Sequence, residues 1–251
     1  MQIILPDTCA NARHDRALTW GLAALIAGPS LACVAQPTLT AGLVGDVDRL
    51  RAGEWWRALT ALLVQPGGLP ALAFLLLGVL LLTPVASRFW GIGTVAGTLA
   101  ATGPGCLAVG LWVSPVNTSA GSSDLVAALV GLTSVALATG GDNFTVGVPV
   151  GTGLAAGYCA FFGAYLLLQP FWGAAAGPAA NLLLVAVVVA CRRHRPSADL
   201  GWAVAAIAVG CAVLMAARLD SHGIGILAGA GLALVARGHR QVRARSTAEG
   251  H

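Results

Sequence analysis

Long stretches without a charged residue constrain this chain more than any other feature. No Asp, Glu, Lys or Arg occurs from Phe89 through Ser123, and after Asp124 none occurs until Asp142. Only 10% of the 251 residues are charged and 57% are hydrophobic, whereas a soluble domain carries about 25% charged residues. A helix that crosses the hydrocarbon core of a bilayer needs roughly 20 apolar residues. The sequence therefore predicts an all-α, polytopic membrane protein surrounded by lipid.

The apolar windows divide the chain into a membrane domain at 17–238, a short tail at 1–16 and a basic tail at 239–251. The longest polar connection, at 36–68, is expected to be an outer loop. The first window also resembles a cleaved signal peptide, because arginines precede its apolar core; its length favours an uncleaved span. We predict about eight transmembrane helices. Seven of them cover approximately 17–35, 69–86, 91–113, 148–168, 173–191, 200–217 and 221–236. The fourth in chain order begins at the polar segment 117–124 and ends near residue 139.

The basic residues, all arginines, are distributed unevenly over the two sides that eight spans would define. Positively charged loops prefer the cytoplasmic side of a membrane. Ten arginines fall on the side of the two termini and four on the other, so both termini are expected to be cytoplasmic and the protein to lie in the cell membrane. This asymmetry explains the net charge of +4 without a nucleic-acid partner. The four outer arginines are Arg49, Arg51, Arg57 and Arg218.

A polar segment, Asn117 to Asp124, interrupts the apolar sequence where the fourth span begins. Ser and Asp are common helix N-caps, because their side chains accept hydrogen bonds from the free N–H groups of the first turn. The alternative is that one serine is a nucleophile presented at the end of a membrane helix. By the span count this segment lies at the outer end of the fourth span.

His222 is the histidine that the span count places at the outer end of a span, on the same side as Ser123. An ionisable residue in that position is a candidate for a functional site. Gly225 and Gly229 follow it at three and seven residues, which places all three on one helical face. Glycines let a second helix approach closely. If that helix is the fourth span, His222 could remove the proton from a serine hydroxyl, as an activated serine nucleophile requires.

These residues together resemble the rhomboid family of intramembrane serine proteases, over approximately 53–235. The segment Gly53-Glu54-Trp55-Trp56-Arg57 is similar to the first outer loop of that family. Gly121-Ser122-Ser123 resembles its Gly-x-Ser motif, and His222 with Gly225 and Gly229 resembles its last-helix motif. The resemblance implies a rhomboid-like bundle in which Ser123 is the nucleophile and His222 the general base. Ser122 and Ser119 are then neighbours without that role.

Three departures from the family pattern are visible. Asp124 occupies the position of the glycine that closes the Gly-x-Ser-Gly motif. The second span lacks the His and Asn that stabilise the oxyanion in the family, and Gln65 is the only side-chain amide near its start. Three spans, rather than one, separate the serine from the histidine. The two extra spans keep both residues on the same side, but the packing of the bundle must differ.

The resemblance implies a serine endopeptidase that cleaves transmembrane or juxtamembrane segments of membrane proteins with a Ser123–His222 dyad. Gly121, Ser122 and Gln65 would position the substrate and its oxyanion, with the Ser123 N–H as a donor. No metal or organic cofactor is implied. Two alternatives stay open: a rhomboid-like protein without efficient catalysis that binds transmembrane partners, and a small-molecule transporter.

Other polar residues have structural interpretations. Asp220 and Arg218 are expected to anchor the last span at the membrane interface, although Asp220 could also orient His222. Asp142 and Asn143 are expected in a cytoplasmic turn. Five of the six cysteines are expected to be small buried side chains, and Cys9 lies in the polar tail. The five are Cys33, Cys106, Cys159, Cys191 and Cys211.

Overall fold

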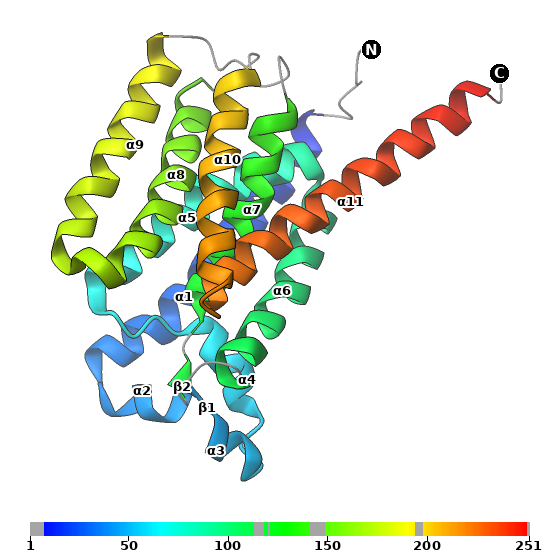
Figure 1. Ribbon diagram of the computed structural model, residues 1–251. Helices are drawn as coiled ribbons and strands as arrows, with labels where there is room; N and C mark the ends of the chain where they lie inside the picture. Colours follow the sequence, from blue (N-terminus) through cyan, green and yellow to red (C-terminus); the bar gives the residue numbers. More distant parts are fainter. Residues whose placement is uncertain (1–7, 113–117, 120, 141–148, 194–197, 250–251) are drawn as a thin grey trace.

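Helices account for almost the whole of the fold (Figure 1). The computed structural model describes residues 8–112, 118–119, 121–140, 149–193 and 198–249. The expected turn at Asp142 and Asn143, the loop at 194–197 and the first seven residues of the N-terminal tail lie outside these ranges.

Eight helices of 18 residues or more are present in the described part of the chain, and each overlaps one predicted span. Five contain segments long and apolar enough to cross a membrane, at His14–Ala35, Gly68–Trp90, Ser122–Thr139, Gly151–Trp172 and Asp199–Ala216. The architecture is thus that of an all-α membrane protein; the full count of eight spans stays a prediction. The helices are α1 Thr8–Ala35, α5 Gly68–Trp90, α6 Ile92–Trp112, α7 Ser122–Gly140, α8 Pro149–Trp172, α9 Ala176–Arg193, α10 Ala198–Ala216 and α11 Ser221–Glu249.

The predicted outer loop at 36–68 is a folded unit of short elements rather than an irregular loop. Arg57 holds it together: its buried guanidinium donates to Glu54 at 2.5 Å and to the carbonyls of Ala41 and Val44 at 2.7 and 3.2 Å. The Arg57 hydrogen bond holds the pKa of Glu54 below its usual value. The elements are α2 Thr38–Leu43, β1 Gly45–Asp46, α3 Val47–Arg51, α4 Trp56–Thr60 and the 3₁₀ turn η1 Ala61–Leu63.

This outer unit is tied to the chain immediately before α7. Strand β1 pairs antiparallel with β2, Thr118–Ser119, so that Gly45 lies opposite Ser119 and Asp46 opposite Thr118. The Gly121 N–H donates to the carbonyl of Ala61 at 2.7 Å. The start of α7 is therefore anchored to the outer unit at two points, strand β1 and the Ala61 carbonyl.

Helix α7 is the centre of the bundle. It packs against α5, α6, α8, α10 and α11 (Figure 1). Nearly every residue from 121 to 138 is buried. Its small side chains allow this, because alanine and glycine let several helices approach at once. Helices α8 and α9 pack on each other at one side of the bundle, joined through the 3₁₀ turn η3, Gly173–Ala175.

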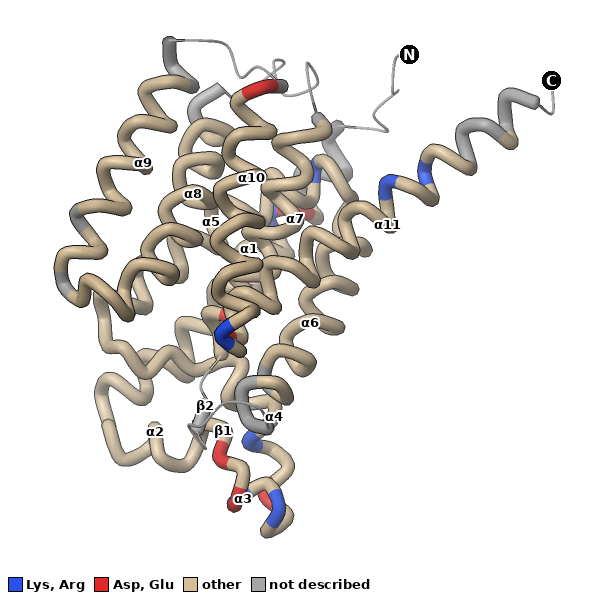
Figure 2. The backbone as a smooth tube through the Cα atoms, viewed as in Figure 1, with Lys and Arg blue, Asp and Glu red and all other residues tan. Residues whose placement is uncertain are grey.

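The two predicted tails are continuations of helices in the described part of the chain. Helix α1 begins at Thr8, and α11 runs on to Glu249, well past the boundary drawn at 239. Figure 1 shows α11 extending away from the bundle, and Figure 2 shows arginines along this extension. Arg240 donates to the carbonyls of Phe89 and Trp90. These contacts satisfy free carbonyls at the end of α5, and hydropathy gives no signal for them.

Candidate active site

The site lies where α7 and α11 begin side by side and run in the same direction (Figure 1). Glycines bring the two backbones together. A Cβ at Gly229 would overlap the carbonyl of Ala128, and one at Gly131 would overlap the carbonyl of Ile226. At Gly225 a Cβ would lie 3.1 Å from the Ala127 Cβ. The glycine face of α11 thus faces α7, and helix approach of this kind is what small residues permit.

Ser123 and His222 meet across this contact, although 99 residues separate them in the chain. The distance between Ser123 Oγ and His222 Nε2 is 2.9 Å. That is within hydrogen-bond reach for a nucleophile and its base. Both side chains are partly exposed, the imidazole by 25%. The predicted proximity of the two residues is therefore observed, while their catalytic roles stay predictions.

Asp220 bonds to the opposite nitrogen of the His222 ring. Its Oδ1 lies 2.8 Å from His222 Nδ1 and also accepts the backbone N–H of His222 at 2.9 Å. The single carboxylate oxygen caps the N-terminus of α11 and contacts the imidazole. Burial acts to raise the pKa of Asp220, but the hydrogen bonds from His222 outweigh burial and hold that pKa below its usual value. A carboxylate on Nδ1 favours the tautomer whose Nε2 accepts a proton from Ser123.

The geometry adds a third residue to the expected pair: Ser123, His222 and Asp220 form a chain from hydroxyl to imidazole to carboxylate, while their catalytic roles stay predictions. The signal that could have identified Asp220 is its position. An Asp directly before a helix is a good N-cap, and a His two residues later presents its own N–H to that cap. The sequence predicts Asp220 as an interfacial anchor that could also orient His222, and the contact with Nδ1 fits the second of these roles.

The turn before Asp220 has an unusual backbone. Leu219 has a positive φ of 61°, a conformation uncommon for residues other than glycine. It reverses the chain between α10 and α11, and the Arg218 guanidinium lies 4.7 Å from the centre of the Phe171 ring. Arg218 thus contacts an aromatic ring of α8.

Ser122 and Gln65 contact each other rather than Ser123. The buried Ser122 Oγ lies 3.2 Å from Gln65 Oε1 and 3.3 Å from the carbonyl of Val64. One hydroxyl hydrogen cannot satisfy both acceptors, so the reverse assignment of the Gln65 amide, with its nitrogen facing Ser122, also fits this site. Ser122 joins the start of α7 to the outer unit. The expected role of Gln65 as an oxyanion donor stays a prediction.

Asp124 is the second carboxyl group at the site. It is 1% exposed, and its Oδ1 accepts from the Ser221 hydroxyl at 3.0 Å. The same oxygen lies 3.9 Å from His222 Nε2. His222 is thus bracketed by Asp220 on one side and Asp124 on the other. Among the described residues no group of three His, Cys, Asp or Glu side chains is placed to bind a metal ion.

Comparisons with models of known protein families, with curated proteins and with solved structures gave no match. The functional argument consequently rests on the geometry of the site.

Proposed function

We propose that this protein is an intramembrane serine endopeptidase, similar to rhomboid proteases, that cleaves transmembrane or juxtamembrane segments of other membrane proteins. The observation that carries the proposal is the 2.9 Å contact between Ser123 Oγ and His222 Nε2, with Asp220 on the far nitrogen of the ring. This arrangement of nucleophile, base and orienting group defines activated serine sites on unrelated folds.

The reaction begins when Ser123 attacks the carbonyl carbon of the scissile peptide. His222 Nε2 takes the hydroxyl proton as the bond between Oγ and carbon forms, and later gives that proton to the leaving amine. Asp220 fixes the ring by accepting its Nδ1–H and stabilises the imidazolium that forms. Water then releases the acyl group from Ser123 by the same proton route.

The oxyanion of the tetrahedral intermediate needs donors near Ser123. The first N–H groups of an α-helix have no partner within the helix, and Ser123 lies in the first turn of α7. Its backbone N–H, with the positive end of the helix dipole, favours negative charge at this point.

The location of the site suits a substrate within the membrane. Ser123 and His222 lie at the beginnings of α7 and α11, beside the outer unit at 36–68. With both termini in the cytoplasm of a cell membrane, the site would open toward the outer face at shallow depth. An Arg193→Cys variant should then be labelled only from the inner side of intact cells; labelling from outside would contradict this orientation.

The activity is tested with reporters that contain one transmembrane segment each, reconstituted with the protein in phosphatidylethanolamine and phosphatidylglycerol liposomes. A panel of differing segments is needed because the substrate sequence is open. Wild type should cleave at least one reporter, and Ser123→Ala and His222→Ala should cleave none. Cleavage that persists in Ser123→Ala would contradict the proposal.

A second candidate is a rhomboid-like protein that binds transmembrane partners with little or no catalysis. The observation that favours it is the contact of the Gln65 amide with Ser122, which ties the side chain expected to help the oxyanion to a neighbouring residue. Removing one oxyanion donor typically costs about 10²- to 10³-fold in rate. The reporter assay separates the candidates, because binding without cleavage would support the second.

A further inference from the structure

Two residues beside the nucleophile and the base make a second link between α7 and α11. Asp124 directly follows Ser123, and Ser221 directly precedes His222. The Ser221 hydroxyl donates to Asp124 Oδ1 at 3.0 Å. This link lies next to the 2.9 Å contact between Ser123 Oγ and His222 Nε2. Two adjacent residues of α7 therefore contact two adjacent residues of α11.

Water has little access to this second link. Asp124 is almost completely buried, and Ser221 is half-buried. A hydrogen bond that is shielded from water is electrostatically stronger than an exposed one. Oδ1 can accept it either as a carboxylate oxygen or as the carbonyl oxygen of the acid. The link consequently does not depend on the charge of Asp124.

The second oxygen of the same carboxyl group is destabilising where it lies. Asp124 Oδ2 is buried and has no hydrogen-bond partner among the described residues. A buried acceptor without a donor costs free energy, so the stability of the bundle does not account for a carboxyl group at this position. What the carboxyl group does provide is a directional contact to Ser221, the first residue of α11.

The glycine contact and this link constrain different motions of α11. Gly229 and Gly131 set how closely the two backbones approach, but a face without side chains has no directional group that opposes rotation of one helix against the other. A hydrogen bond prefers a near-linear arrangement of donor and acceptor. The bond between Ser221 and Asp124 therefore fixes the rotation of the first turn of α11, and with it the direction of the His222 ring.

We propose that Asp124 and Ser221 are positioning residues whose hydrogen bond holds His222 Nε2 in line with Ser123 Oγ. The inference rests on the proposed endopeptidase activity and deepens it, because it names the groups that set the geometry of proton transfer. The role needs no contact of either side chain with the substrate. The Ser123 proton still moves to His222 Nε2, and Asp220 still orients the far nitrogen of the ring.

The position of Asp124 Oδ1 shows what the loss of this bond would do. Oδ1 lies 3.9 Å from His222 Nε2, which is too far for a hydrogen bond. Without the Ser221 hydroxyl, Oδ1 loses that donor and competes with Ser123 Oγ for the Nε2 side of the ring. Removing the hydroxyl should therefore turn the base away from the nucleophile without changing the nucleophile itself.

The test measures fluorophosphonate labelling of Ser123 in the full-length protein in detergent, as a function of probe concentration. This dependence separates the maximum labelling rate from the probe concentration that gives half of it. A positioning residue changes the first and leaves the second, because it acts on proton transfer and not on binding. Ser221→Ala should lower the maximum rate about 10- to 100-fold, since a displacement of 1 Å can cost about 100-fold.

Conservative variants at the same two positions should preserve the rate. Ser221→Thr keeps the hydroxyl, and Asp124→Asn keeps an acceptor oxygen on a side chain of the same shape. Both should label within a few-fold of wild type, whereas Asp124→Leu should fall at least as far as Ser221→Ala. The double variant of Ser221→Ala with Asp124→Leu should lose no more than Asp124→Leu alone, because both changes remove the same bond.

Thr139→Ala is the matched control. Thr139 lies at the other end of α7, where its hydroxyl donates to the Val135 carbonyl of its own helix at 2.7 Å, so this variant should label like wild type. Helical content and thermal unfolding of each variant check that the bundle is intact. Ser221→Ala removes only a half-buried hydroxyl, so it decides the question even if Asp124→Leu does not fold.

A maximum rate in folded Ser221→Ala equal to that of wild type would overturn the inference while leaving the proposed function in place. Loss of labelling in a folded Asp124→Asn equal to that in Asp124→Leu would also overturn it, since the charge of Asp124 rather than the hydrogen bond would then matter. Wild type that shows no Ser123-dependent labelling would overturn the proposed function and this inference together.

Discussion

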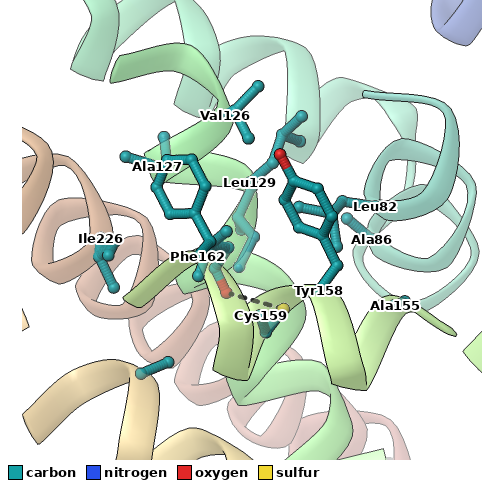
Figure 3. Packing of buried hydrophobic residues seen from close by; sticks show 14 of the residues in the cluster. Leu82, Ala86, Val126, Ala127, Leu129, Ala155, Tyr158, Cys159, Phe162 and Ile226 are labelled. Atoms are coloured by element: carbon teal, nitrogen blue, oxygen red, sulfur yellow. Dashed lines mark hydrogen bonds between the residues drawn. The ribbon is translucent and has the colours of Figure 1, made fainter. Parts of the chain in front are cut away.

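Two helix contacts in this molecule join distant segments by opposite means. The contact of α7 with α11 depends on the absence of side chains: Gly131, Gly225 and Gly229 let the backbones touch. The contact of α5 with α8 is made by large side chains, and Figure 3 shows the Tyr158 ring of α8 beside Leu82 and Ala86 of α5. Phe74 stacks on Tyr158 with ring centres 4.9 Å apart, and the Tyr158 hydroxyl donates to the Phe74 carbonyl at 3.1 Å.

The two contacts differ in how precisely each one fixes the relative position of the helices that it joins. Backbones in direct contact have no rotatable bonds between them, so the glycine contact sets the separation of Ser123 and His222 closely. Aromatic side chains can change rotamer and still fill the space. The ring of Phe162 lies 6.4 Å from that of His222, so the aromatic contact reaches the site but does not define the distance between nucleophile and base.

The largest effect is expected when the glycine contact is broken. A leucine at Gly225 would press on Ala127 and on the carbonyl of Asp124, since even its Cβ would lie 3.1 to 3.2 Å from them. Displacing a catalytic group by 1 Å can cost about 100-fold in rate, and a leucine would push the whole start of α11 away from α7, so fluorophosphonate labelling of Gly225→Leu should be abolished. Gly231→Leu, on an open part of the same helix, is the matched control and should label like wild type. Equal labelling of both variants would show that the glycine contact does not hold the site.

A smaller effect is expected when the backbone contact is kept and only the orientation of the base is disturbed. Asp220→Asn should lower the labelling rate about 10²- to 10⁴-fold, because the Asn amide favours the wrong tautomer of His222. The exposed Asp48→Asn serves as control. A wild-type rate in Asp220→Asn would mean that the glycine contact alone suffices.

The Asp220 carboxylate also determines how the stability of the protein changes with pH. The pKa of Asp220 is lowered by folding, so its contribution is complete above the usual aspartate pKa of 3.8 and is lost as the pH falls through the lower, folded-state value. Thermal unfolding of wild type should therefore lose stability below about pH 4, and Asp220→Asn should lose less over the same range. Parallel pH curves for the two proteins would contradict this assignment.

The smallest effect is expected at the aromatic contact. Tyr158→Phe removes the hydrogen bond to Phe74 but keeps the stacked ring. Hydrogen bonds between membrane helices contribute about 0.6 kcal/mol, so the midpoint of unfolding should shift slightly and labelling should stay unchanged. A drop in labelling larger than a few-fold would show that the aromatic contact also positions the site.

The sequence predicted the positions of the long helices well, because a bilayer requires apolar segments of fixed length and polar residues mark their ends. It also predicted that the face of Gly225 and Gly229 would bring His222 to Ser123. The sequence does not predict the equally close approach of Gly131 from α7, since it is the one glycine inside that helix and no spacing pattern marks it.

The contacts that the sequence could not predict are those between segments without periodicity. The pairing of β1 with β2 involves only two residues on each side, too few to produce an alternating pattern. The burial of Arg57 depends on carbonyls 13 and 16 residues away. The hydrogen bond from the Gly121 N–H to the Ala61 carbonyl depends on the same folded unit, and Asp124 Oδ2 has no hydrogen-bond partner among the described residues.

The most direct test of the central claim is to locate the adduct that a fluorophosphonate probe forms with the intact protein, by mass spectrometry of its peptides. The account predicts one adduct, on Ser123, which is absent in Ser123→Ala and retained in Ser119→Ala and Ser122→Ala. An adduct that persists in Ser123→Ala, or that maps to Ser122, would contradict the assignment of Ser123 as the nucleophile activated by His222.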